Sequence, residues 1–247
     1  FVLSVFIGRS QSASFTPPGA ISLGDFDIPG NQLTVEAIIY WRGGANILTK
    51  HTDPTNLNYL FRPNSGEFTT YNTGNSGATT FYNMGNPNPT PNNTWIHLAV
   101  VYNGSTAAFF VNGCQTHSIP VTGNMMQNDI ITTIGGFNGG IGNYGVNPGE
   151  YFDGDIDELR IWNVARSQAQ ISANMNDLPT YATEPGLLAY YKFDGDYNNL
   201  VPGPNGIATG GVSFGAEHPT IEPFSIDSIT TVNSCTGNDG ALTVYTN

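Results

Sequence analysis

Four acidic residues lie close together in a chain that otherwise carries little charge. Asp153, Asp155, Asp157 and Glu158 fall within one short run, whereas only 11% of all residues are charged. Carboxylates at this density fit two interpretations. They can bind Ca²⁺, a hard cation that prefers oxygen ligands, or they can form a solvated acidic strand edge that discourages aggregation between strands. The residues alone leave both interpretations open.

The segment that carries these acids has the alternation of a β-strand. From Ile156 onward, period two places Asp157 on one face together with Leu159 and Ile161. A carboxylate on an apolar face must be hydrogen-bonded, paired with a cation or bound to a metal, because an isolated buried charge is too costly. Asp157 is therefore our first candidate for a Ca²⁺ ligand.

Further ligands for this predicted structural Ca²⁺ site lie nearby in the sequence or in an earlier turn. Asp153 and Asp155 are the next candidates, and Asp25 is a more distant one. The Gly- and Asn-rich loop at 138–149 directly precedes the acidic run and could supply backbone carbonyl oxygens.

Aromatic and amide residues in long loops form a second group with binding chemistry. Sugars present C–H patches that stack on aromatic rings and hydroxyls that need hydrogen-bond donors and acceptors. The candidates are Tyr59, Tyr71, Tyr82, Asn138, Asn143, Tyr144, Asn147 and Tyr151. The alternative is that these are ordinary turn-forming Asn and exposed Tyr residues.

Catalysis is disfavoured by the pattern of acids. An all-β enzyme that cleaves β-glucans would be expected to carry Glu-x-Asp-x-x-Glu on one strand, because its nucleophile and its general acid must flank the same bond. The chain has no such run, and we expect no enzyme activity. His97 sits within an alternating strand, which favours a structural histidine over a metal ligand.

Composition limits the classes of partner. The net charge is −12 with seven basic residues, so nucleic acid and anionic membranes are poor partners, since phosphate binding needs clustered Lys and Arg. The two cysteines, Cys114 and Cys235, lie in differently patterned regions, and we expect them not to be bonded to each other.

Many short alternating runs separated by Gly, Pro and Asn turns predict an all-β fold. The clearest runs are 33–41, 95–102 and 107–111, and Asn112-Gly113 after the last is a hairpin signal. One helix is expected at 167–175, with Ser167 as its N-cap. Leu187–Phe193 and Ile207–Phe214 read as two late strands.

The order of several runs resembles the laminin-G-like, concanavalin A-like jelly rolls of secreted and surface proteins. The runs are Leu33-Thr34-Val35-Glu36-Ala37, Trp95-Ile96-His97-Leu98-Ala99-Val100, Phe110-Val111-Asn112-Gly113, Ile134-Gly135-Gly136 and Phe152 to Asn163. The resemblance implies a two-sheet antiparallel jelly-roll sandwich. The family often has Phe-Asp-Gly on its first strand, where this chain has Phe15-Thr16-Pro17, so a metal ligand from that position is in doubt.

We divide the chain into three parts on this basis. Residues 1–13 are a leading strand or the remnant of a signal peptide, and residues 14–218 are the jelly roll. Residues 219–247 are a linker and the truncated start of a second β module, which resembles the repeats of gliding-motility adhesins around Cys235 to Gly240.

The function expected from these observations is a lectin-like adhesion module, secreted or on the cell surface, that binds a glycan and Ca²⁺ without catalysis. Its partners would be a glycan or other extracellular polymer and the neighbouring modules of a longer chain, without nucleic acid and without membrane insertion. The alternatives are a structural spacer that contacts other modules without binding sugar, and a glycoside hydrolase.

Overall fold

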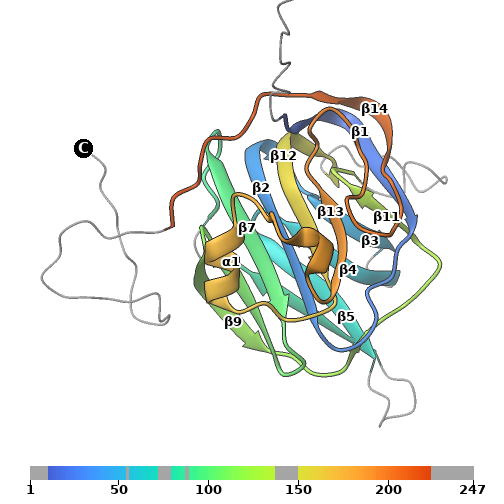
Figure 1. Cartoon of the computed structure of the whole chain (residues 1–247). Helices are drawn as coiled ribbons and strands as arrows, with labels where there is room; N and C mark the ends of the chain where they lie inside the picture. Colours follow the sequence, from blue (N-terminus) through green and yellow to red (C-terminus); the bar gives the residue numbers. More distant parts are fainter. Residues whose placement is uncertain (1–10, 54–55, 72–78, 87–88, 137–149, 224–247) are drawn as a thin grey trace, which may run out of the picture.

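Antiparallel strands make up most of the regular secondary structure of the computed structural model (Figure 1). The structure describes residues 11–53, 56–71, 79–86, 89–136 and 150–223. One layer contains β9 (Cys114–Pro120), β8 (Thr106–Val111), β7 (Trp95–Tyr102), β2 (Leu33–Gly44), β12 (Phe152–Trp162) and β13 (Leu187–Tyr191). The other contains β10 (Asn124–Met125), β6 (Thr79–Gly85), β5 (Ser65–Tyr71), β4 (Asn56–Arg62), β3 (Leu48–Asp53) and β11 (Ile131–Ile134). β1 (Ala13–Asp25) pairs with β11 and β12 and so joins the layers, and β14 (Ile207–Phe214) pairs with β1.

A single apolar core fills the space between the two layers. Phe109 on β8 faces Phe61 on β4 with ring centroids 6.4 Å apart, so side chains from the two sheets meet directly. Val35 and Ile39 on β2 and Leu98 on β7 also belong to this core, as their period-two spacing predicts. The all-β, two-sheet jelly roll expected from the sequence is therefore confirmed.

The predicted alternation of β12 is wrong at one point, because the strand contains a β-bulge. Asp157 pairs with Ile38 and Arg160 pairs with Glu36, so two residues of β12 oppose one residue of β2. Glu158 adopts φ of 51°, the left-handed conformation that bulges often use. The extra residue reverses the faces, so Leu159 joins the core and Asp157 points to the opposite, outer face.

The outer face of the β7–β2–β12 layer is largely covered by later parts of the chain. The helix α1 (Gln168–Asn174) begins at Ser167, whose side chain forms a capping box with Gln170, and it buries Ile171 against Val101 and Phe110. The segment that follows, including the short 3₁₀ helix η3 (Tyr181–Thr183), covers Trp162. Figure 1 shows α1 in front of β7.

The last described residues, 215–223, form what we call the exit segment. It leaves β14, crosses the outer face and reaches the end of α1, where Ile221 packs against Ile38 and Met175 (Figure 1). Asn176 fixes it from both sides: its Oδ1 accepts from the Ile221 amide at 2.6 Å and its Nδ2 donates to the Ile221 carbonyl at 2.8 Å.

The two late strands complete the sandwich, as the sequence predicts. β13 pairs with the second half of β12, and β14 pairs with β1. The boundaries at residues 13 and 218 stay predictions, and residues 1–10 and 224–247 lie outside the described part of the chain.

The expectation for the cysteines is wrong. Cys114 is disulfide-bonded, and Cys235 is the only other cysteine of the chain. Cys235 itself lies outside the described residues. The exit segment brings the chain to α1, and α1 neighbours the β8–β9 turn, where a Cβ on Gly113 would lie 3.0 Å from Ser172.

Candidate functional site on the outer face

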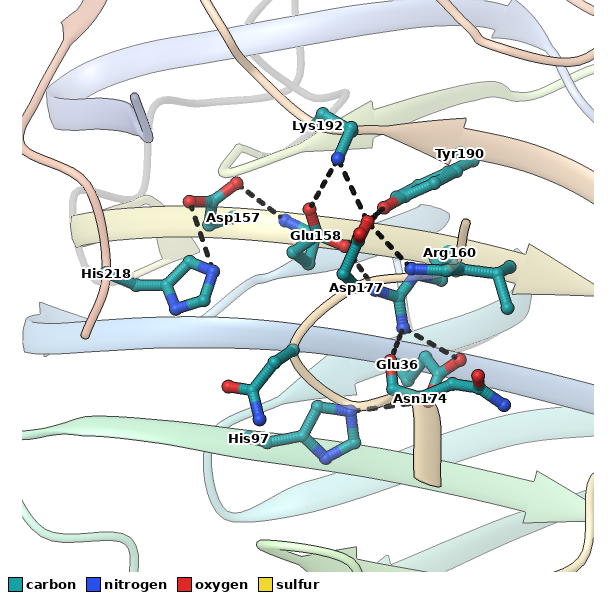
Figure 2. Close-up of polar contacts among 12 residues, drawn as sticks. Glu36, His97, Asp157, Glu158, Arg160, Asn174, Asp177, Tyr190, Lys192 and His218 are labelled. Atoms are coloured by element: carbon teal, nitrogen blue, oxygen red, sulfur yellow. Dashed lines mark hydrogen bonds and ion pairs between the residues drawn. The ribbon is translucent and has the colours of Figure 1, made fainter. Parts of the chain in front are cut away.

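Charged side chains gather on the outer face where β2, β7, β12 and β13 lie side by side (Figure 2). Glu36 stands at the centre of one half and is fully buried. Its carboxylate lies 3.3 Å from His97 Nε2 and 3.5 Å from Arg160 Nη1, and it accepts a hydrogen bond from Trp162 Nε1 at 3.3 Å. Burial alone would raise the pKa of Glu36, but the His97 hydrogen bond and the Arg160 charge outweigh it and lower the pKa.

Glu158 stands at the centre of the other half, where the bulge places it. Its carboxylate accepts hydrogen bonds from Arg160 and from the Tyr190 hydroxyl, and Lys192 Nζ lies 3.9 Å away. Arg160 thus links the two carboxylates, and its Nη1 also donates to the Asn174 carbonyl at 2.7 Å. The arrangement neutralises two buried acids with cations and hydrogen bonds, which is what keeps such groups inside a protein.

Asp157 is almost fully buried next to these groups, with 1% of its surface exposed. Its Oδ1 accepts from the Glu158 amide at 2.8 Å, and its Oδ2 has no hydrogen-bond partner among the described residues. Burial, and then the Glu158 charge, raise the pKa of Asp157 to about 9. A carboxyl with such a pKa is protonated at neutral pH, so the structure compensates Asp157 by removing its charge.

His218 of the exit segment faces Asp157. Its Nε2 lies 3.8 Å from Asp157 Oδ2, while its Nδ1 lies 2.7 Å from the Pro219 carbonyl. A carbonyl oxygen only accepts, so Nδ1 carries a hydrogen, and the neutral ring presents the Nε2 lone pair to Asp157. A proton on Asp157 or on Nε2 therefore makes this contact favourable.

Asp153 and Asp155 lie toward the open end of the same face and are held by Arg42. Arg42 Nε donates to Asp153 at 3.1 Å, and Arg42 Nη1 donates to Asp155 at 2.8 Å. Arg42 is about one-third exposed, so this is a surface pair rather than a buried one.

Asp25 lies elsewhere, at the end of β1. The ammonium group of the fully buried Lys50 binds Asp25 and also lies 2.7 Å from Asp27. A cation of the protein's own thus occupies the position between these two carboxylates.

The four predicted Ca²⁺ ligands do not form a shared site in this arrangement. Asp157 faces His218, Asp153 and Asp155 face Arg42, and Asp25 faces Lys50. No group of three or more His, Cys, Asp or Glu side chains with metal-binding geometry occurs in the ranges that the structure describes. As a set, these residues do not fit a calcium ion, because the protein's own cations already neutralise three of the four.

Two of the predicted sugar-binding residues, Tyr59 and Tyr82, lie in strands rather than in long loops. Tyr59 is not a loop residue: it lies in β4, is 3% exposed, and donates from its hydroxyl to the Phe26 carbonyl at 2.7 Å. The expected position of Tyr59 in a long loop is therefore wrong, and its role in ligand binding stays a prediction. Tyr82 lies in β6 and is half-buried against the core, and its hydroxyl accepts from the Thr122 amide at 3.3 Å. Tyr71 is the last residue of β5, and Tyr151 is buried, with 5% of its surface exposed. The remaining candidates, Asn138, Asn143, Tyr144 and Asn147, lie outside the described residues.

A motif with the spacing of a catalytic serine site lies at the end of β14. Gly211-Val212-Ser213-Phe214-Gly215 has the Gly-x-Ser-x-Gly spacing of a nucleophile elbow. That elbow needs a sharp turn from a strand into a helix, whereas Ser213 lies within the extended β14 and pairs with Ser14. The motif is therefore a strand segment here.

Comparison with known proteins gives the family. Residues 16–172, more than half of the chain, match the laminin G model described as the concanavalin A-like lectin/glucanases superfamily. The chain belongs to this superfamily. No curated protein matches it.

Two solved structures share the fold of this superfamily member. A Bacteroides ovatus protein described as carbohydrate-binding aligns with a TM-score of 0.61 and 19% identity, over 87% of this chain and 62% of that one. The chain therefore spans less than two thirds of that protein's length. A heptameric SAP-like pentraxin from Limulus polyphemus aligns with a TM-score of 0.55 and 17% identity, over 85% of this chain and 97% of that one. At these identities, the likeness concerns the fold.

Proposed function

We propose that the chain is a non-catalytic, lectin-like module that binds a glycan as part of a secreted or cell-surface protein. The superfamily contains both lectins and glucanases, so the choice between them rests on the acids. A glycosidase holds two carboxyl groups about 5 to 10 Å apart on either side of the scissile bond, both open to the substrate.

The observation that carries this proposal is the internal compensation of the acids on the outer face. Glu36 and Glu158 are buried and bound to Arg160, and Asp157 is buried against the exit segment. Asp153 and Asp155 share Arg42. Acids held in this way stabilise the fold and are not presented in pairs to a substrate.

Binding of the purified chain to an array of neutral and charged glycans tests the proposal. We expect saturable binding to one class of polysaccharide and no release of sugar from polysaccharide mixtures. Release of sugar that is lost in Glu36→Gln or Glu158→Gln variants, while their folding is unchanged, would instead show a hydrolase.

The exit segment favours a second candidate, a spacer that positions neighbouring modules. Asn176, Asp157 and the Ile38 contact all fasten this segment to the jelly roll, so the chain leaves from a fixed point. A flat result across the glycan array would leave the spacer function standing and contradict the lectin function.

No helix within the described residues is long and apolar enough to cross a membrane.

Calcium binding is not part of this proposal and stays a prediction from the sequence. An ion bound by Asp153 and Asp155 would have to displace Arg42. The loop at 138–149, the expected source of carbonyl ligands, lies outside the described residues. Thermal melting of calcium-loaded protein with and without a chelator tests it, since a ligand that binds only the folded state at a hundredfold excess over Kd adds about 2.7 kcal/mol. An unchanged melting temperature would rule out a stabilising calcium site.

A further inference from the structure

One row of paired residues crosses the open end of the outer face, perpendicular to the strands. Trp95 on β7 pairs with Tyr40 on β2, and Tyr40 pairs with Asp155 on β12. Asp155 in turn pairs with Ser14 on β1, and Ser14 pairs with Ser213 on β14. Four strand spacings of about 4.8 Å make the row about 19 Å long.

All five side chains point away from the core, because their neighbours along each strand point into it. Ile39 and Ile96 flank Tyr40 and Trp95 in this way, and Ile156 flanks Asp155. Unlike Trp162 and Tyr190 at the covered end, which are fully buried, Tyr40 and Trp95 are only half-buried. The row is therefore the part of this face where outward aromatic rings reach solvent.

We propose that this row binds an extended neutral polysaccharide, an inference that rests on the glycan-binding function proposed above. Trp95 and Tyr40 form its stacking end, with ring centroids 5.6 Å apart. Neither Tyr40 Oη nor Trp95 Nε1 has a hydrogen-bond partner within the described ranges, and neither atom is buried. The two rings thus combine apolar faces with free polar atoms, the combination that a sugar ring requires.

The middle of the row supplies hydrogen-bonding groups in a fixed orientation. Arg42 binds Asp153 and Asp155 with separate nitrogens, and its Nη2 donates to the Phe15 carbonyl at 3.4 Å. The guanidinium also lies 6.0 Å from the centre of the Tyr40 ring. Because two carboxylates share one cation, this middle part is net negative and favours sugar hydroxyls over acidic sugars.

The far end of the row is made of two small hydroxyl residues, the half-buried Ser14 and the exposed Ser213. The exit segment borders the row along one side. His218 contacts the Trp95 ring at a centroid distance of 6.1 Å, and a Cβ on Gly215 would lie 3.1 Å from Asp155 Oδ1. This border sets the direction in which a polysaccharide can lie.

The test compares the full chain with variants on the row, in affinity electrophoresis through gels that contain neutral polysaccharides. Trp95→Ala and Tyr40→Ala should each raise the Kd about tenfold, the effect expected from the loss of one aromatic stacking contact. Trp95→Phe, which keeps a ring, should recover most of the affinity. Ser213→Arg, at an exposed position, should obstruct binding without disturbing the core.

Phe81→Ala is the matched control, because Phe81 is an aromatic residue on β6 in the other layer and is 51% exposed. It should bind as the unmodified chain does. Thermal melts of all variants separate loss of binding from loss of folding.

The outcomes distinguish this inference from the function on which it rests. If the unmodified chain is not retarded by any neutral polysaccharide, the glycan-binding function fails and the row fails with it. If the unmodified chain binds and the folded Trp95→Ala, Tyr40→Ala and Ser213→Arg variants bind equally well, the row is wrong and the site lies elsewhere on the jelly roll.

Discussion

Single residues on the outer face show two ways of burying an acid. Glu36 and Glu158 both contact the Arg160 guanidinium, whereas Asp157 has only the Glu158 amide and the distant His218 ring. Desolvation then decides the protonation state of Asp157, since no cation lies close enough to offset it. Buried acids on neighbouring strands, Glu36 on β2 and Asp157 on β12, therefore have opposite pKa shifts.

The raised pKa of Asp157 predicts a pH dependence of stability. Its pKa is about 9 in the folded state and near 3.8 when unperturbed. The proton therefore stabilises the folded state fully below pH 3.8, and this contribution is lost as the pH rises toward 9. Relative to Asp157→Asn, which cannot ionise, the free energy of unfolding should fall by up to about 1.4 kcal/mol per pH unit in this window.

Denaturant unfolding at a series of pH values measures this difference. Asp153→Asn, on the exposed part of the same strand, serves as the control and should run parallel to the unmodified chain. Parallel curves for Asp157→Asn as well would show that Asp157 is ionised in the folded protein.

Replacement of Arg160 should lower the free energy of unfolding. Arg160→Met would leave Glu36 and Glu158 buried without their shared cation, and breaking a buried pair in this way costs about 3–5 kcal/mol. Arg42→Met removes a partly exposed pair and should cost less than about 1 kcal/mol. Equal losses for the two variants in denaturant unfolding would contradict the assigned difference in burial.

At the scale of elements, β12 organises the molecule because three strands share its edges. β2 pairs along one edge, while β1 and then β13 pair along the other. The bulge at Glu158 lies between the β1 and β13 pairings, so the two halves of the strand serve different neighbours. The family match covers residues 16–172. β13 and β14 lie beyond it and complete the sandwich.

Truncation tests this view of the late strands. A chain ending at residue 186 loses β13 and β14 and exposes the edges of β12 and β1, so we expect it not to unfold cooperatively. A chain ending at residue 223 keeps both strands and the exit segment and should fold. A sharp thermal transition of the shorter chain at the same temperature as the longer one would show that β13 and β14 are dispensable.

At the scale of the whole molecule, charge decides which partners the surface can accept. The chain has seven Lys and Arg residues and a net charge of −12. The six that lie in the described ranges all form ion pairs within the chain: Arg42, Lys50, Arg62, Arg160, Arg166 and Lys192. Few cations are therefore free to meet phosphate or sulfate groups.

The scarcity of free cations predicts that glycan binding does not depend on the release of counterions. The affinity for a neutral polysaccharide should change little as salt is raised, whereas DNA, anionic vesicles and sulfated polysaccharides should not be retained even at low salt. Binding measurements across a salt series check this. Retention on a sulfated polysaccharide at low salt that disappears at high salt would contradict it.

The sequence by itself determined the sandwich, because period-two runs such as those around Val35 and Leu98 are local signals that leave few choices of face. It also located the helix cap at Ser167 and the late strands. Tertiary structure alone decided the roles of the polar residues. A single bulge moved Asp157 to the other face, and Arg42 and Lys50 reached Asp153, Asp155 and Asp25 from strands distant in sequence. The row from Trp95 to Ser213 likewise exists only through the pairing of five strands, because hydrogen-bond register sets which side chains become neighbours.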